Sequence, residues 1–224
     1  MYWGPRALKV GLLALCSTWA AESVAADNEL WLSQTVRKKT ADKLWVEARG
    51  HVRLDENASH LQKLMPELRL DWKPQKWLQF SAGYRFVLES DDDSLDAIAH
   101  RYHFDAGVEK GWRWLELDYR VRYQEKHPQG GVDFTTVLRN RWMASAKIKG
   151  SDFKPSMGIE LFSDPATLDR VRFTLACAYA IKKGHRLRVR LHHQSETDGD
   201  EVRRIVAMDY QFKLPKKSKK AGTN

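Results

Sequence analysis

A strict alternation of apolar and polar residues constrains this chain more than any other feature. Between Leu115 and Tyr123 every second residue is apolar or aromatic, and each residue in between is charged. Successive side chains of a β-strand point to opposite faces, so this period predicts a strand with one apolar and one charged face. The pattern recurs at 78–86, 171–181 and 187–191. The sequence therefore predicts an all-β protein.

Residues 1–26 have the features of a secretory signal peptide. Arg6 and Lys9 precede an apolar run that extends to Ala21, and small residues then lead to Asp27. The run is shorter than the ~20 residues that a helix needs to span a bilayer. We expect cleavage near Ala26, which also removes Cys16. Cys177 is then the sole cysteine, so the exported chain has no intramolecular disulfide.

The rest of the chain reads as one domain at 27–214, followed by a basic tail at 215–224. Tight turns are predicted at 73–76, 110–113 and 182–185, and longer or more acidic loops at 90–97, 125–133 and 163–167. Short turns at one end and longer loops at the other are typical of outer-membrane barrels. Polar, Gly or Pro residues separate the predicted strands, which are 29–38, 43–54, 61–72, 77–89, 98–109, 114–124, 134–148, 155–162, 168–181, 186–194 and 202–214.

Alternation alone also fits a soluble sandwich or a lipocalin-like barrel, because it does not say which face is inside. Strand length and aromatic residues near strand ends, such as Trp72, Tyr84 and Tyr123, favour a membrane barrel. The last strand carries Tyr210 and Phe212, similar to the aromatic signal that the outer-membrane assembly machinery recognises. We predict an antiparallel up-and-down transmembrane β-barrel of about ten to twelve strands in a bacterial outer membrane. Its partners would be outer-membrane lipid and that machinery.

Five segments carry a further signal: 64–86, with its Trp72-Lys73-Pro74 turn and Gly83-Tyr84-Arg85-Phe86, then 100–104, 119–124, 138–141 and 160–162. Together they resemble the domain-of-unknown-function 2490 family. The resemblance covers nearly all of the mature chain, and it implies an exported outer-membrane β-barrel without a settled activity. Two features depart from the expected barrel: residues 213–224 follow the final aromatic, and eleven is an odd number of strands. Bacterial barrels normally have an even number, so we expect one predicted strand to be missed, merged or false.

If the apolar face meets lipid, the polar face lines a densely charged lumen. The first half of this wall mixes both signs of charge, and the second half is strongly basic. The candidate acidic lumen residues are Glu47, Glu67, Asp71, Asp105, Glu116, Asp118 and Glu160. The candidate basic residues, which would set selectivity, are Arg120, Arg122, Arg139, Arg141, Arg170, Arg172, Arg186, Arg188 and Arg190.

Two interpretations of this lumen stay open. Arginines that pair with carboxylates across a narrow lumen would give a plugged, structural barrel. A basic wall that stays open would give a narrow channel that prefers small anionic solutes, with Arg188 and Arg190 as the leading selectivity residues. A soluble periplasmic β-barrel that binds an acidic ligand is the alternative of a different class. A register slip of one residue would turn both arginines toward lipid.

Enzymatic and metal-binding functions find little support in the residues. His193 and Ser195 share a face, but residues two apart on a strand lie about 6.5 Å apart along it, too far for a hydrogen-bonded catalytic pair. His192 and His193 face opposite ways, as do His100 and His103, so neither pair chelates a metal. We expect Gly83 and Gly107 to ease strand curvature. No enzyme activity, cofactor, metal or nucleic-acid partner is expected, despite a net charge of +9.

Overall fold

Eleven strands account for most of the residues that the structure describes. The structure is a computed structural model, and it describes residues 27–91, 94–131, 133–164, 166–199 and 201–215. The predicted signal peptide and the predicted tail from residue 216 onward lie outside the described residues. The strands are β1 (Asp27–Ala41), β2 (Leu44–Asp55), β3 (His60–Trp72), β4 (Leu78–Asp91), β5 (Ser94–Gly111), β6 (Leu115–Pro128), β7 (Thr135–Ala146), β8 (Phe153–Ser163), β9 (Leu168–Lys182), β10 (His185–Glu196) and β11 (Val202–Lys213).

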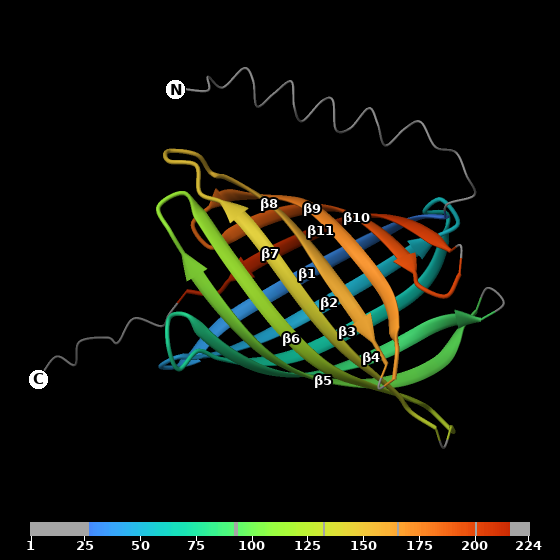
Figure 1. Cartoon of the computed structure of the whole chain (residues 1–224). Coiled ribbons are helices and arrows are strands. Elements are labelled where there is room, and N and C mark those ends of the chain that lie inside the picture. Colours follow the sequence, from blue (N-terminus) through green and yellow to red (C-terminus); the bar gives the residue numbers. More distant parts are fainter. Residues whose placement is uncertain (1–26, 92–93, 132, 165, 200, 216–224) are drawn as a thin grey trace, which may run out of the picture.

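The strands form a closed barrel in which each pairs with its neighbour in sequence, and β1 pairs with β11 (Figure 1). All neighbours are antiparallel except β1 and β11, which are parallel from Asp27 opposite Arg203 to Arg37 opposite Lys213. The expectation that one predicted strand is missed, merged or false is therefore wrong. In an up-and-down barrel with an odd number of strands the first and last run in the same direction, so a parallel pair must close it. β1 consequently begins at one end of the barrel and β11 ends at the other.

The connections have similar lengths at both ends of the barrel. The longest connections are 147–152 at the end where β11 finishes and 129–134 at the opposite end. The prediction of longer loops at one end is thus wrong. The reason is that strand pairing continues into the predicted loops: Asp91 pairs with Ser94, and Ala99 on β5 pairs with Pro128 at the end of β6.

The polar face of each strand points into the barrel. On β3 the exposed fraction is 3% for Glu67 and 61% for the adjacent Leu68. Arg69 and Asp71 are also buried, whereas Leu64 and Leu70 are exposed. The usual arrangement of a soluble barrel, with apolar side chains inside, is inverted here.

A small apolar cluster interrupts the charged interior. Met65 on β3, Val87 on β4 and Ala99 on β5 pack together and are almost completely buried. Pro66 follows Met65 and has no N–H to donate to a neighbouring strand. The regular β3–β4 pairing is interrupted at this point, between the pairs Leu64–Leu88 and Glu67–Arg85. Within the residues that the structure describes, no helix is long and apolar enough to cross a membrane.

Candidate functional site: the charged lumen

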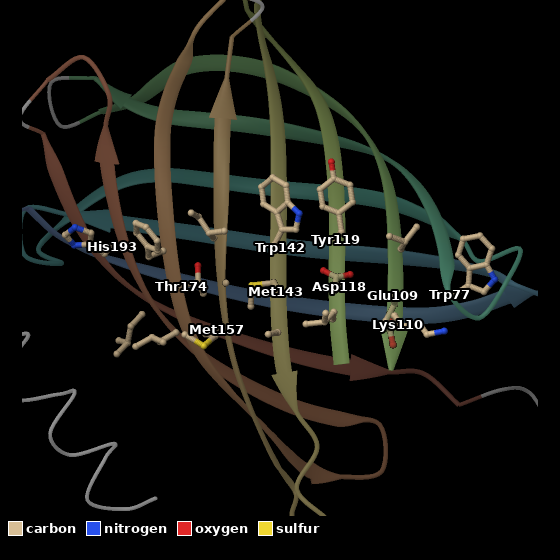
Figure 2. Close-up of a pocket in the computed structure, with 18 residues that line it drawn as sticks. Trp77, Glu109, Lys110, Asp118, Tyr119, Trp142, Met143, Met157, Thr174 and His193 are labelled. Carbon is tan, nitrogen blue, oxygen red and sulfur yellow. The ribbon is translucent and has the colours of Figure 1, made fainter. Parts of the chain in front are cut away.

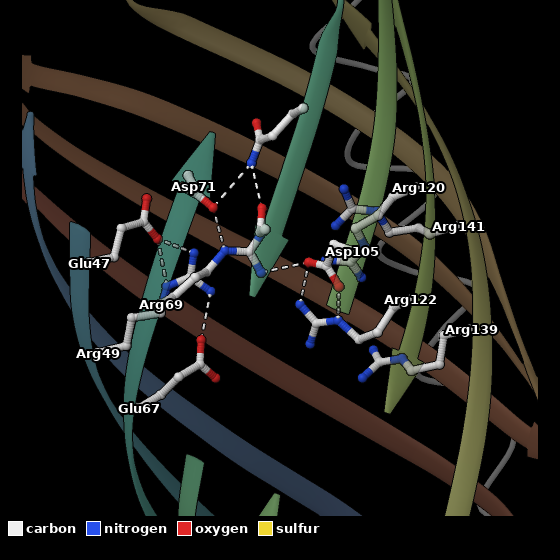
Figure 3. Close-up of polar contacts among 12 residues, drawn as sticks. Glu47, Arg49, Glu67, Arg69, Asp71, Asp105, Arg120, Arg122, Arg139 and Arg141 are labelled. Carbon is white, nitrogen blue, oxygen red and sulfur yellow. Dashed lines mark hydrogen bonds and ion pairs between the residues drawn. The ribbon is translucent and has the colours of Figure 1, made fainter. Parts of the chain in front are cut away.

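Asp105 on β5 is the centre of one ion-pair network in the lumen (Figure 3). It accepts hydrogen bonds from Arg69 Nη1 at 2.6 Å and from Arg122 Nε at 2.6 Å. Arg69 also donates to Asp71 Oδ1 at 2.7 Å and to Ser81 Oγ at 2.7 Å. Strand pairing places these side chains on one face, because Asp105 lies opposite both Ser81 on β4 and Arg122 on β6. The network therefore spans β3 to β6 along the inner wall.

A second network joins the carboxylates of β2 and β3. Arg49 Nε donates to Glu47 at 2.9 Å, and Arg49 Nη1 lies 3.3 Å from Glu67 Oε1. Arg37 on β1 contacts Glu47 at 3.0 Å and Asp71 at 3.1 Å. Because Asp71 also belongs to the Asp105 network, charge pairing is continuous from β1 to β6.

Glu160 on β8 forms ion pairs with three arginines, which come from β6, β7 and β9. Its carboxylate lies 2.9 Å from Arg120 Nη2, 2.9 Å from Arg139 Nη2 and 3.4 Å from Arg172 Nη1. Arg172 Nε also donates to Gln194 Oε1 at 3.0 Å. One carboxylate among three cations leaves this side of the lumen with a surplus of positive charge.

A stack of arginine and aromatic side chains crosses the lumen. The Arg53 guanidinium lies 3.9 Å from the Trp31 ring centroid, and the Arg172 guanidinium lies 5.1 Å from the same centroid. Arg172 also lies 4.7 Å from the Phe162 ring, over which Arg139 lies at 4.5 Å. Trp31 is on β1 and Arg172 on β9, which are separated in the sheet by β10 and β11. We call these five side chains the lumen stack.

Sequence reasoning missed Trp31, Phe162 and Asp209. A signal was available for Trp31, because it has the same strand parity as Glu29, which is buried in the lumen. Phe162 has the parity of Glu160 but was grouped with the resemblance rather than with the lumen. Aromatic residues on the polar face break the alternation, and only the structure shows that arginines cover their rings.

The remaining paired residues form local contacts, closer to the end where β11 finishes for all except Arg170, which lies near the opposite end. Arg141 donates to Asp118 at 2.6 Å, and Arg190 donates to Asp209 at 2.7 Å. Glu116 contacts Lys147 at 3.1 Å and also Lys154. Arg170 contacts its neighbour Asp169 at 2.9 Å.

Arg186 and Arg188 differ from the other predicted arginines. Among the residues that the structure describes, neither of these two side chains forms an ion pair or a hydrogen bond, although strand parity places both on the lumen face. Arg188 lies opposite Ala178 on β9 and Asp209 on β11, and Ala178 is buried inside the barrel.

Gly83 has a role that the sequence did not predict. A Cβ at this position would lie 2.3 Å from the imidazole of His103, so the glycine makes room for a buried histidine. The expectation that Gly83 only eases curvature is therefore incomplete. His103 itself is 1% exposed and faces the lumen, while His100 stacks on Tyr84 at the outer face.

The residues considered for catalysis and metal binding are divided between the inner and outer faces of the barrel. His192 and Gln194 are buried inside the barrel, and alternation places His193 and Ser195 on the outer face. Within the described ranges, no group of three or more His, Cys, Asp or Glu side chains is close enough to hold a metal ion.

The sequence of this barrel was compared with known protein families. The family model described as a protein of unknown function, DUF2490, matches residues 28–204. The chain belongs to the DUF2490 family. The DUF2490 match begins in β1 and ends within β11, so it contains Trp31, Asp105, Glu160 and Arg188. No curated protein matches the chain.

Proposed function

We propose that this DUF2490 protein is a non-enzymatic barrel of the bacterial outer membrane whose lumen is closed to through-flow. The supporting observation for closure is the burial of inward-facing side chains on every strand except β7. Examples with exposed fractions of 3% or less are Glu29, Glu47, Asp71, His192 and Ile205. The lumen stack adds a contact from β1 to β9 across the interior.

The outer face supports the membrane location. Large apolar side chains on all sides of the barrel are exposed, among them Leu68, Phe104, Met157 and Phe173, each at 54% or more. The strands have 11 to 18 residues, and a tilted strand needs about 9–11 to cross a bilayer. A soluble periplasmic barrel would have to leave this apolar surface in water.

A hollow in the outer wall suits lipid chains. It has a volume of about 1300 Å³ and extends over β5 to β10 (Figure 2). Tyr119, Trp142, Met157 and Phe173 are among the residues that line it. In a bilayer, acyl chains would fill such an apolar surface, so outer-membrane lipid is the proposed partner here.

Closure follows from the cost of breaking the networks. Buried charges are stable only while they are paired, and removing a partner costs several kcal/mol. Arg139 and Arg172 belong to both the lumen stack and the Glu160 network, so a hydrated ion that crosses the lumen would have to break contacts in both. The networks thus act as a plug made by the strands themselves, and the proposed role is structural.

A narrow anion-preferring channel is the second candidate. Arg186 and Arg188 favour it, because no carboxylate among the described residues pairs with them. It differs from the closed barrel in one observable property, conductance.

Extraction and gel mobility test the proposed location. The full chain, expressed in a Gram-negative host, should remain with the membranes after a salt wash and require detergent for extraction. Unheated samples should migrate differently from boiled ones, because a closed barrel resists unfolding by detergent. Recovery of the folded chain in the soluble periplasmic fraction would contradict the proposal.

A further inference from the structure

The lumen is open to water at the end where β11 finishes. Arg186 and Arg188 face inward by strand parity, yet both are exposed. Arg141 on β7 and Arg190 on β10 have side chains that are 29% and 28% exposed. By contrast, the inward-facing Arg122 and Arg172 are exposed by only 5% and 8%. We call this water-accessible end of the lumen the C-terminal mouth.

Positive charge in the C-terminal mouth is not balanced. The largest electrostatic interactions of Arg188 are with Arg190, Arg186 and Arg141, and with one carboxylate, Asp209. That carboxylate already accepts a hydrogen bond from Arg190. Arg141 is likewise engaged with Asp118. The guanidinium groups of Arg186 and Arg188 therefore keep their donors available.

A polar cavity adjoins Arg186, which lies two residues before Arg188 on the same face of β10. It has a volume of about 460 Å³, within the usual range for small-molecule sites. Arg186, Lys182, Lys183 and Lys213 line it, with Asp152 as the carboxylate among its lining residues. Lys213 is held in place because its backbone N–H donates to Gly184 O at 2.8 Å. Gly184 has a φ of 85°, which lets the β9–β10 turn reverse tightly beside the cavity.

We infer that the C-terminal mouth binds a phosphate-bearing anion between Arg186, Arg188 and Lys213. Guanidinium groups match phosphate oxygens with two parallel hydrogen bonds, and ammonium groups add charge without a fixed direction. The inference rests on the proposed closed lumen, which makes the mouth a blind vestibule and not the entrance of a pore. The phosphate could belong to a soluble compound or to a lipid headgroup, since the outward-facing Ile181 and His185 also line the cavity.

Titration with inorganic pyrophosphate tests the site. The refolded mature barrel in zwitterionic detergent is titrated calorimetrically at low salt. We expect saturable binding that the double substitution Arg186→Gln, Arg188→Gln weakens at least tenfold. Arg113→Gln is the matched control, because it removes a positive charge from the exposed β5–β6 turn at the same end. This control should bind with unchanged affinity.

Two further measurements are needed. One distinguishes a lipid headgroup from a soluble compound as the source of the phosphate, and the other distinguishes phosphate binding from closure of the lumen. In nanodiscs, phosphatidylglycerol in place of phosphatidylcholine should weaken pyrophosphate binding if headgroups occupy the site, and should leave it unchanged if the ligand is soluble. Both results support the inference. Absent binding to a folded barrel, or equal binding by the double variant, would overturn it. Conductance of the same preparation reports separately on closure, so a conducting barrel would contradict the proposed function alone.

Discussion

At the scale of single residues, the charge pairing in the lumen depends on carboxylates that each form ion pairs with more than one cation. Asp105 is the strongest case, because its side chain is 3% exposed and contacts both Arg69 and Arg122. Strand parity was enough to place such residues on the inner face. It could not tell which cation pairs with which carboxylate, because contacts such as Arg69–Asp105 skip a strand. The pairing of Arg190 with Asp209 was missed because Asp209 was not among the predicted lumen residues, and because it lies diagonally from Arg190 on the neighbouring strand, opposite Arg188.

Asp105→Asn should strongly destabilise the barrel. The substitution leaves the buried Arg122 without its counter-charge and leaves Arg69 with Asp71 alone, which costs about 3–5 kcal/mol. Asp118→Asn is the matched control: Asp118 pairs with Arg141 but its side chain is 34% exposed, so its loss should cost no more than about 1 kcal/mol. Urea-induced unfolding in detergent micelles, followed by tryptophan fluorescence, measures both. Equal losses would mean that the Asp105 network is solvated.

At the scale of elements, the parallel β1–β11 pair is the unusual feature. The sequence predicted all eleven strands, because alternation and punctuation are local signals. Strand ends such as Ser94 and Pro128 were misplaced, since pairing with a neighbour extended the strands past polar residues. The closing pair was beyond a sequence argument: β1 and β11 lie far apart in the chain, and a preference for even strand numbers pointed the other way.

A disulfide between β1 and β11 tests the direction and register of this closing strand pair. Leu32 lies opposite Met208, and strand spacing brings such partners within the Cα distance that a disulfide needs. In a Cys177→Ser background, Leu32→Cys with Met208→Cys should form a cross-link under mild oxidation, visible as a shift in unfolded gel mobility. The pair Leu32→Cys with Val206→Cys is displaced by two residues and should cross-link far less. Preferential cross-linking of this displaced pair would contradict the register.

At the scale of the whole molecule, the barrel has an apolar exterior and a charged, largely filled interior. The sequence predicted the two faces of each strand and left open whether the lumen is plugged or conducting. The structure favours the plug through burial and through the lumen stack, in which Trp31 and Phe162 occupy positions that the alternation pattern reserves for polar residues. Sequence patterns contain no information on how far side chains reach across a lumen. The choice between the two interpretations therefore needed the side-chain contacts that the structure provides.

Planar-bilayer conductance tests the closed lumen most directly. The refolded mature protein is inserted into the bilayer, and heat-dependent gel mobility verifies that it is folded. The account predicts that the inserted barrel shows no steady conductance at any applied voltage. Steady anion-selective steps that weaken or reverse in Arg188→Glu would contradict it, and would instead establish the lumen as an anion channel.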